Sequence, residues 1–267
     1  MVIRNVCMTS LPGDVLRDEA QWESLFSDVG GMTYHTRRSL TASAPGISPI
    51  VLVHGFGMSG GYLMPTAKRL AAKCAAVYVP DLPGHGKSDT PESPLNMLGL
   101  ANALIDWLDA MDIAQADLVG HSMGCQIASD VSVRFPTRVR RLALIGPTVD
   151  PSHRNIRAQL PRALYACTFE RPGLLLHFMA DYWRMGTRLW PEAIAMLNYP
   201  IEEKLSCIEQ PVLLIRGQRD KLAPQRWLDQ ASQMTGAERV VTIPNWGHNV
   251  IYSAPDAVVA ELWSFLG

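Results

Sequence analysis

The sequence is poor in cysteine and has no excess of charge of either sign. Five cysteines occur among 267 residues, an odd number, and no two have the Cys-x-x-Cys spacing of a zinc or redox site. This usage argues against a disulfide framework and favours reduced thiols in a cytoplasmic protein. The 24 lysines and arginines are offset by 25 aspartates and glutamates. The strongly basic balance of a nucleic-acid-binding domain is therefore missing, and we expect no nucleic-acid partner.

Long apolar runs, internal repeats and low-complexity stretches are missing as well. No run is long enough for a transmembrane helix, so we expect no membrane span. The first residues also lack the apolar centre of a signal peptide. What the chain does contain is 48% hydrophobic and only 18% charged residues. At this length, that composition is sufficient for one large domain with a buried core.

Short apolar runs alternate with helical patterns along most of the chain. Continuous apolar runs are typical of strands that are buried on both faces of a sheet. Repeated strand–helix units predict an α/β fold with a mostly parallel, doubly wound sheet. The apolar residues among the first 20 positions follow neither helical nor strand spacing, and we expect this segment to form an N-terminal arm. Two short strands are expected between residues 22 and 40, around the Gly30–Gly31 turn. The other expected strands cover residues 49–53, 76–79, 117–119, 141–145, 211–215 and 239–243.

The alternation stops between residues 150 and 208, where helical patterns rich in Leu, Met, Tyr, Phe and Trp replace it. We therefore predict a core made of residues 1–149 and 209–267, interrupted by a helical lid over 150–208. Two explanations fit the apolar residues of this lid. Small helices need a core of their own, and ligand pockets are lined mainly by apolar side chains.

The predicted lid also carries six arginines, which are candidates for holding a substrate carboxylate. Three acids lie among them, Glu170, Asp181 and Glu192. This mixture of signs favours a solvated surface of mixed charge over an anion site.

The pentapeptide Gly120–Gly124 reads Gly-His-Ser-Met-Gly between an apolar run and a helical pattern. This context is typical of a nucleophile elbow, a sharp strand-to-helix turn that projects the serine above a sheet. Glycines on both sides allow the strand and the helix to approach each other. Ser122 is thus the candidate nucleophile. We expect Cys125 to be a small packing residue rather than a second nucleophile.

A serine nucleophile needs a histidine base, which in turn needs an orienting acid. After a nucleophile elbow these partners follow in the order acid, then histidine. Asp220 and His248 provide this order, and each follows an expected strand. The carboxyl ends of parallel strands meet at one edge of the sheet, so we predict that both residues lie beside Ser122. Asp150, which follows the strand over 141–145, is the alternative acid.

The chemistry also needs donors for the oxyanion of a tetrahedral intermediate. The backbone N–H groups of Met123, at the start of the elbow helix, and of Phe56, after an earlier strand, are the candidates. We expect His54 and His85 to bond their own loops and His121 to line the elbow. Such a mechanism requires no metal and no organic cofactor.

Five motifs in this order resemble the α/β-hydrolase superfamily, and the resemblance runs from residue 49 to the end apart from the lid. It implies the α/β-hydrolase fold. The pairing of Phe56 with Met123 resembles the carboxylesterase and perhydrolase branch. The implied substrate is an apolar ester or lactone, cleaved through an acyl-enzyme on Ser122. The motifs are His54–Gly57, Asp81–Ser88, Gly120–Gly124, Gly217–Asp220 and Asn245–His248.

Two other functions remain open at this point. C–C bond hydrolases of ring-cleavage pathways use the same triad, but they usually carry asparagine before the serine and tryptophan after the histidine. This chain has His121 and Asn249 at those positions. A ligand receptor of the same fold with slow turnover is the second alternative. The oligomeric state is not indicated by any of these patterns.

Overall fold

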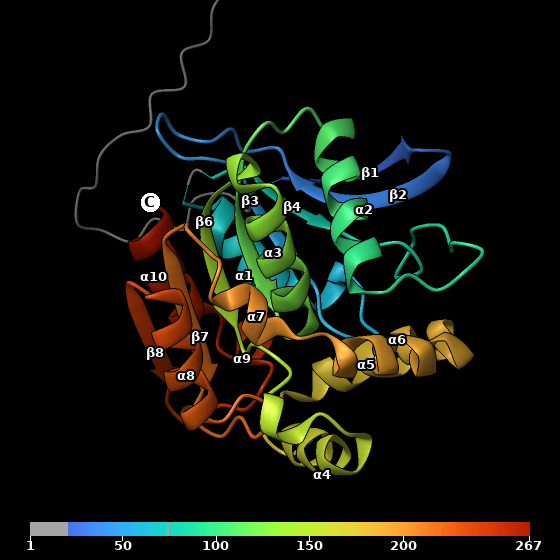
Figure 1. Cartoon of the computed structure of the whole chain (residues 1–267). Helices are drawn as coiled ribbons and strands as arrows, with labels where there is room; N and C mark the ends of the chain where they lie inside the picture. The colour runs from blue at the N-terminus through green and yellow to red at the C-terminus, as the bar shows by residue number, and fades with distance from the viewer. Residues whose placement is uncertain (1–20, 74) are drawn as a thin grey trace, which may run out of the picture.

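The computed structural model describes residues 21–73 and 75–267 (Figure 1). Within these residues eight strands form one sheet, in the order β1-β2-β4-β3-β5-β6-β7-β8. The expected arm, residues 1–20, lies outside the described residues. The strands are β1 (Trp22–Val29), β2 (Met32–Ser39), β3 (Ile50–Val53), β4 (Val77–Pro80), β5 (Ala116–His121), β6 (Val139–Ile145), β7 (Val212–Gly217) and β8 (Arg239–Ile243).

The sheet is mostly parallel, as predicted. Strands β1 and β2 form an antiparallel hairpin at one edge, and β2 is antiparallel to β4. Every other neighbouring pair, from β4 to β8, is parallel. Because six strands run in the same direction, the loops that follow their carboxyl ends meet at one edge of the sheet.

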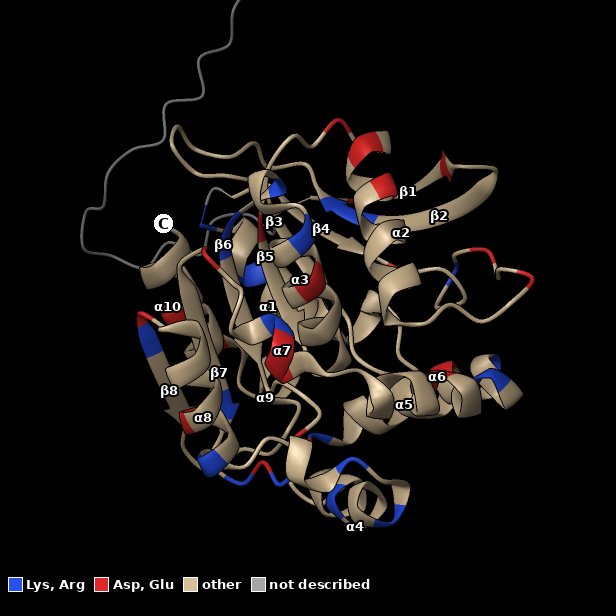
Figure 2. Ribbon diagram, viewed as in Figure 1, with Lys and Arg blue, Asp and Glu red and all other residues tan. Residues whose placement is uncertain are grey.

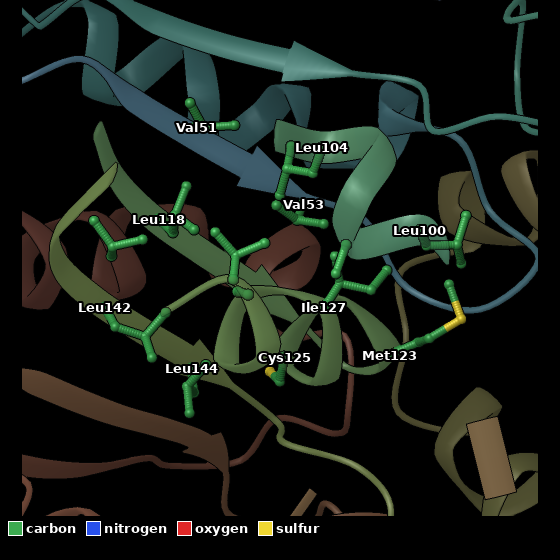
Figure 3. Close-up of a cluster of buried hydrophobic side chains, with 14 of the residues drawn as sticks. Val51, Val53, Leu100, Leu104, Leu118, Met123, Cys125, Ile127, Leu142 and Leu144 are labelled. Carbon is green, nitrogen blue, oxygen red and sulfur yellow. The ribbon is translucent and has the colours of Figure 1, made fainter. Parts of the chain in front are cut away.

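Helices cover both faces of this sheet (Figure 1). Side chains alternate along β3: Val51 and Val53 belong to one buried cluster, and Ile50 and Leu52 to the other. Figure 3 shows part of the first cluster, between the strands and the helices α2 and α3. The chain thus forms the predicted three layers. The covering helices are α1 (Met64–Ala71), α9 (Val250–Ser253) and α10 (Pro255–Leu266) on one face, and α2 (Met97–Ala110), α3 (Met123–Arg134) and α8 (Gln225–Thr235) on the other.

Between β6 and β7 the chain forms helices and no strand. The helices α4, α5 and α6 lie beyond the edge of the sheet, at the bottom of Figure 1. The last helix, α7, instead packs on α3 and α8, and its Ile201 and Leu205 are fully buried there. We call α4, α5 and α6 the lid helices, after the lid that the sequence predicts. Their bounds, with that of α7, are α4 (Ile156–Cys167), α5 (Pro172–Met185), α6 (Leu189–Asn198) and α7 (Ile201–Leu205).

Candidate active site

Ser122 lies at the sharp turn between β5 and α3, with a positive φ of 54°. Positive φ is uncommon for a residue other than glycine and is a form of strain found at functional sites. A Cβ atom at Gly120 would lie 2.6 Å from the carbonyl oxygen of Gly124. One at Gly124 would lie 2.3 Å from the carbonyl oxygen of Val53. Both positions therefore require glycine, as the elbow motif predicts.

Ser122, His248 and Asp220 form one continuous hydrogen-bonded chain. The Ser122 hydroxyl lies 2.9 Å from Nε2 of His248, and Nδ1 of His248 lies 2.8 Å from a carboxylate oxygen of Asp220. The other carboxylate oxygen of Asp220 accepts hydrogen bonds from the backbone N–H groups of Leu222 and Ala223, at 2.8 and 3.0 Å. The acid is thus held by its own loop, and the histidine is held by the acid.

His248 and Asp220 each stabilise the charged form of the other. Burial disfavours the charged form of each residue. For His248, the nearby charge of Asp220 and the hydrogen bond to it outweigh burial, so the pKa of His248 is raised. For Asp220, burial is likewise outweighed by His248 and by the backbone donor Ala223, so the pKa of Asp220 is lowered. Asp220 is therefore ionised at neutral pH and favours an imidazolium at His248.

Asp150, the alternative acid, is engaged elsewhere. Its carboxylate bonds Nδ1 of His153 at 3.1 Å and the backbone N–H of Ser152 at 3.0 Å, and it pairs with the guanidinium of Arg226. The structure therefore brings Asp220, and not Asp150, to His248.

The two candidate oxyanion donors flank Ser122. Met123 is the first residue of α3, and its side chain points into the core (Figure 3). On the other side, Gly55 packs against the serine, since a Cβ added there would lie 3.1 Å from the Cβ of Ser122. Within the described residues, the backbone N–H groups of Phe56 and Met123 donate to no protein acceptor. Both amides are thus free to bind an oxyanion.

The structure adds Tyr62 to the site, a residue that the sequence motifs did not single out. The backbone N–H of Gly55 donates to the Tyr62 hydroxyl at 2.8 Å, and this hydroxyl lies 2.7 Å from Nδ1 of His121. The opposite nitrogen of His121, Nε2, lies 3.2 Å from the carbonyl oxygen of His248. Tyr62 and His121 therefore connect the loop before Phe56 with the loop that carries His248, the candidate base.

The protonation of His121 follows from its partners. A carbonyl oxygen only accepts, so Nε2 carries the proton that is donated to His248. Nδ1 then accepts from the Tyr62 hydroxyl. Burial, together with the neighbouring charge of His248, lowers the pKa of His121 to about 3. His121 is thus a neutral side chain of the elbow with both nitrogens occupied.

A cavity of about 570 Å³ lies in front of Ser122. Ser122 and His248 line its inner end, and residues of all three lid helices line the rest. Among the described residues, no lysine, arginine, aspartate or glutamate lines this cavity. Leu164, Leu175 and Trp190 line the cavity and are also exposed to solvent, so its mouth lies among the lid helices.

The three acids that lie among the arginines of the insertion do not form the solvated surface that we expected. Glu170 accepts from the backbone N–H of Asn249 at 2.9 Å and from the hydroxyl of Ser253 at 2.5 Å. Asp181 accepts from the backbone N–H and the hydroxyl of Ser59, at 2.8 and 2.9 Å. That expectation was wrong because acids that are brought against buried donors become acceptors rather than surface charges.

The third acid, Glu192, lies 2.8 Å from Nε2 of His85. Asp181 of α5, Glu192 of α6 and Glu170, between α4 and α5, thus hydrogen-bond the insertion to three separate parts of the core. His85 also bonds its own loop, through Nδ1 and the carbonyl of Pro83, and His54 bonds the carbonyl of Gly55 and the backbone N–H of Leu82. The expectation for these two histidines is confirmed, with the bond to Glu192 as an addition.

Cys125 directly follows the elbow and is fully buried. Burial raises the pKa of its thiol, which disfavours the nucleophilic thiolate. Cys125 thus packs in the core, as Figure 3 shows. Among residues 21–73 and 75–267, no group of three or more His, Cys, Asp or Glu side chains is arranged to hold a metal ion. No helix in this part of the chain has the length and apolar character needed to cross a membrane.

Comparison with known proteins places the chain among hydrolases. A pimeloyl-[acyl-carrier protein] methyl ester esterase of Stenotrophomonas maltophilia is 28% identical over 81% of this chain and 92% of its own length. An uncharacterized protein of Mycobacterium tuberculosis is 33% identical over 164 residues, which are 60% of this chain. The aligned part spans only 46% of that relative, about half its length.

A solved structure, Est816, described as an N-acyl homoserine lactone degrading enzyme, matches 90% of this chain with a TM-score of 0.75. The match covers 100% of that structure at 20% sequence identity, and this likeness supports the fold. A family model described as "Alpha/beta hydrolase family" matches residues 50–261. These residues include the elbow serine, the acid and the histidine. The chain therefore belongs to the alpha/beta hydrolase family.

Proposed function

We propose that this protein is a serine hydrolase that cleaves an apolar ester or lactone through an acyl-enzyme on Ser122. The observation that carries this proposal is the hydrogen-bonded chain from the Ser122 hydroxyl through His248 to Asp220, at 2.9 and 2.8 Å. A serine hydroxyl becomes a nucleophile only when a base within hydrogen-bond distance accepts its proton. The strained backbone of Ser122 holds the hydroxyl in that position.

In the first half of the reaction, Oγ of Ser122 attacks the acyl carbon while Nε2 of His248 takes the hydroxyl proton. The ionised Asp220 stabilises the imidazolium that forms. The carbonyl oxygen becomes an oxyanion and accepts hydrogen bonds from the backbone N–H groups of Phe56 and Met123. When the intermediate collapses, the bond to the alcohol oxygen breaks. His248 returns its proton to that oxygen, and the acyl group stays on Ser122.

In the second half, His248 takes a proton from water, and the resulting hydroxide attacks the acyl carbon. The bond to Oγ of Ser122 breaks, the proton returns to the serine, and the carboxylic acid leaves. Each proton thus moves between the substrate, water and the side chains of this chain. The chemistry needs no group beyond these residues.

The substrate class follows from the cavity in front of Ser122. Its volume of about 570 Å³ has room for a substrate with a sizeable apolar portion, and no charged side chain of the described residues lines it. A substrate carboxylate inside this cavity would lack a cationic partner, and a buried unpaired charge is costly. An uncharged ester or lactone avoids that cost. The methyl ester esterase among the relatives is consistent with this class.

We further propose that the helices α4, α5 and α6 act as a lid over Ser122. They line the outer part of the cavity, and the carboxylates of Glu170, Asp181 and Glu192 hold them to the core. Closure of such an element excludes water from the reacting groups.

Hydrolysis of p-nitrophenyl esters of increasing acyl length tests the proposal. We expect a burst of p-nitrophenol equal to the enzyme concentration, since acylation of Ser122 releases the alcohol first. We also expect kcat/KM to rise by up to about fourfold for each methylene that the cavity buries. The Ser122→Ala variant should lose the burst.

Two results would contradict the proposal. Turnover of a vinylogous diketone with no turnover of esters would identify a C–C bond hydrolase. Tight, reversible ligand binding without turnover of either substrate would identify a receptor.

A further inference from the structure

The exposed face of α5 is apolar along its whole length. Six exposed residues lie at positions i, i+3, i+4, i+7, i+8 and i+11, which form one stripe on a helix. We call them the α5 stripe. Their large members are strongly exposed: Trp183 to 88%, Leu176 to 70% and Met179 to 64%. The six residues are Pro172, Leu175, Leu176, Met179, Ala180 and Trp183.

The opposite face of α5 packs against the rest of the protein. Leu174, Asp181 and Met185 are buried against the rest of the protein. Surface helices normally bury their apolar stripe and expose polar residues. This helix instead buries an acid, which bonds Ser59, and exposes its apolar stripe. Folding of this chain therefore does not account for the α5 stripe.

The neighbouring lid helices extend the apolar surface. On α4, Leu160 and Leu164 are exposed, and on α6, Trp190 and Ile194 are exposed. Single exposed apolar residues are ordinary, but large contiguous apolar patches mark protein or membrane contacts. Leu160 and Leu164 of α4, Leu175 of α5 and Trp190 of α6 all line the same cavity, so exposed apolar residues of the three helices meet around its mouth.

The exposed charged side chains of the lid helices are all arginines, because the two acids on these helices, Asp181 and Glu192, are buried. Arg157 and Arg162 on α4 and Arg184 on α5 have no acidic partner within the described residues. Figure 2 shows α4 with basic residues and no acidic ones. The acids of residues 150–199 are engaged on the inner side, by Arg226 and His153, Ser253, Ser59 and His85. The outer face of the lid helices is thus apolar and basic.

We propose that this face docks on the surface of an anionic lipid membrane. Tryptophan and leucine side chains insert at the boundary between headgroups and acyl chains, and arginines attract anionic headgroups. The positive charge of the arginines disfavours a second copy of this chain as the partner of this face. In a two-fold dimer the same patch meets itself, so the arginines would face arginines.

Docking in this orientation also brings the mouth of the cavity to the lipid. Leu164, Leu175 and Trp190 surround that mouth. An apolar substrate dissolved in the bilayer would then reach Ser122 without crossing water. This consequence rests on the proposed function, whereas the docking itself does not.

The test is flotation of the 267-residue chain with vesicles, without substrate, so that it is independent of catalysis. We expect binding to phosphatidylcholine vesicles that contain phosphatidylglycerol, weakened by added salt because exposed charges are screened. The double variants Trp183→Asp/Met179→Asp and Arg157→Glu/Arg184→Glu should each lower the partition coefficient by about tenfold or more.

Control variants introduce the same acidic residues, one at a time, on other faces of the protein. Leu40 and Lys68 are exposed outside the lid helices. Leu40→Asp and Lys68→Glu should bind within about twofold of the wild type. Circular dichroism and thermal unfolding establish that each variant is folded, and the charge-reversal pair provides a second test if the apolar pair does not fold.

Three results would overturn the proposal. The wild type could fail to float with anionic vesicles, or both lid variants could float as well as the controls do. Light scattering could instead reveal a dimer of the wild type that the lid variants lose. The face would then join two copies of the chain.

Discussion

The hydroxyl of Tyr62 lies 2.7 Å from Nδ1 of His121, and this contact links two halves of the candidate active site. Tyr62 accepts a hydrogen bond from the oxyanion loop at Gly55, and His121 donates one to the backbone carbonyl of His248. A buried, uncharged pair of side chains thus connects the loop of the proposed oxyanion donor Phe56 with the proposed base His248. We regard both as positioning residues, since neither reaches the reacting atoms.

Replacing Tyr62 by phenylalanine tests this positioning role. The change leaves the buried N–H of Gly55 without its acceptor, which should lower the free energy of unfolding by about 1–3 kcal/mol. We expect kcat to fall with little change in KM, because the loop that carries Phe56 loses its anchor rather than its contact with substrate. Tyr78→Phe, at a half-buried tyrosine on β4, is the control. An unchanged kcat in Tyr62→Phe would exclude the role.

Asp220→Asn compared with Asp150→Asn tests the identity of the acid. An asparagine at position 220 neither stabilises the imidazolium nor holds the reactive tautomer of His248. We therefore expect kcat to fall by about 10³- to 10⁴-fold. Asp150 bonds His153 and Arg226, so its variant should lose stability more than rate. The larger rate loss in Asp150→Asn would move the acid to that position.

The pH dependence of kcat/KM should reflect the raised pKa of His248. The base acts only when it is neutral, so activity disappears as the pH falls through this pKa. Asp220 stabilises the protonated form, which places the loss above the ordinary histidine value of about 6.5. The residual activity of Asp220→Asn should keep its acid limb at lower pH. If the activity of the wild type were instead lost only at a pH well below the ordinary histidine pKa, the hydrogen-bonded pair of His248 and Asp220 would be contradicted.

Asp181→Ala tests the hydrogen bonds that hold the lid helices. Ser59 loses the acceptor for both its backbone N–H and its hydroxyl, and a bond to a charged group contributes about 1.5–3 kcal/mol. We expect trypsin to cleave at the lid arginines about tenfold faster or more, because α5 opens more often. Glu203→Ala, at an exposed glutamate of α7, is the control. Equal cleavage rates in the two variants would remove the proposed anchoring.

Sequence patterns were sufficient for the architecture and for the residues that join Ser122. Apolar runs of strand length give the parallel sheet, and a parallel sheet brings the loops after β5, β7 and β8 to one edge. Asp220 and His248 are far from Ser122 in the chain, but both could be identified because each follows one of these strands. The apolar runs identify the strands, and the polar residues that directly follow them identify the candidates for the site.

The parts that escaped prediction depend on packing between distant segments. Tyr62 has no motif, and its role arises only when its helical turn lies against Gly55 and His121. The direction in which Asp181 and Glu192 point could not be read from charge counts, because a mixed-charge segment looks the same whether its acids face water or the core. The cytoplasmic location that the cysteine content indicates stays a prediction.

Mass spectrometry of the protein after reaction with a fluorophosphonate tests the central claim most directly. The wild type should gain one phosphonyl group, mapped to the peptide that contains Ser122, because only a serine with an adjacent base attacks such a probe at neutral pH. The Ser122→Ala variant should gain none. A phosphonyl group on another residue, or labelling that persists in Ser122→Ala, would contradict the account.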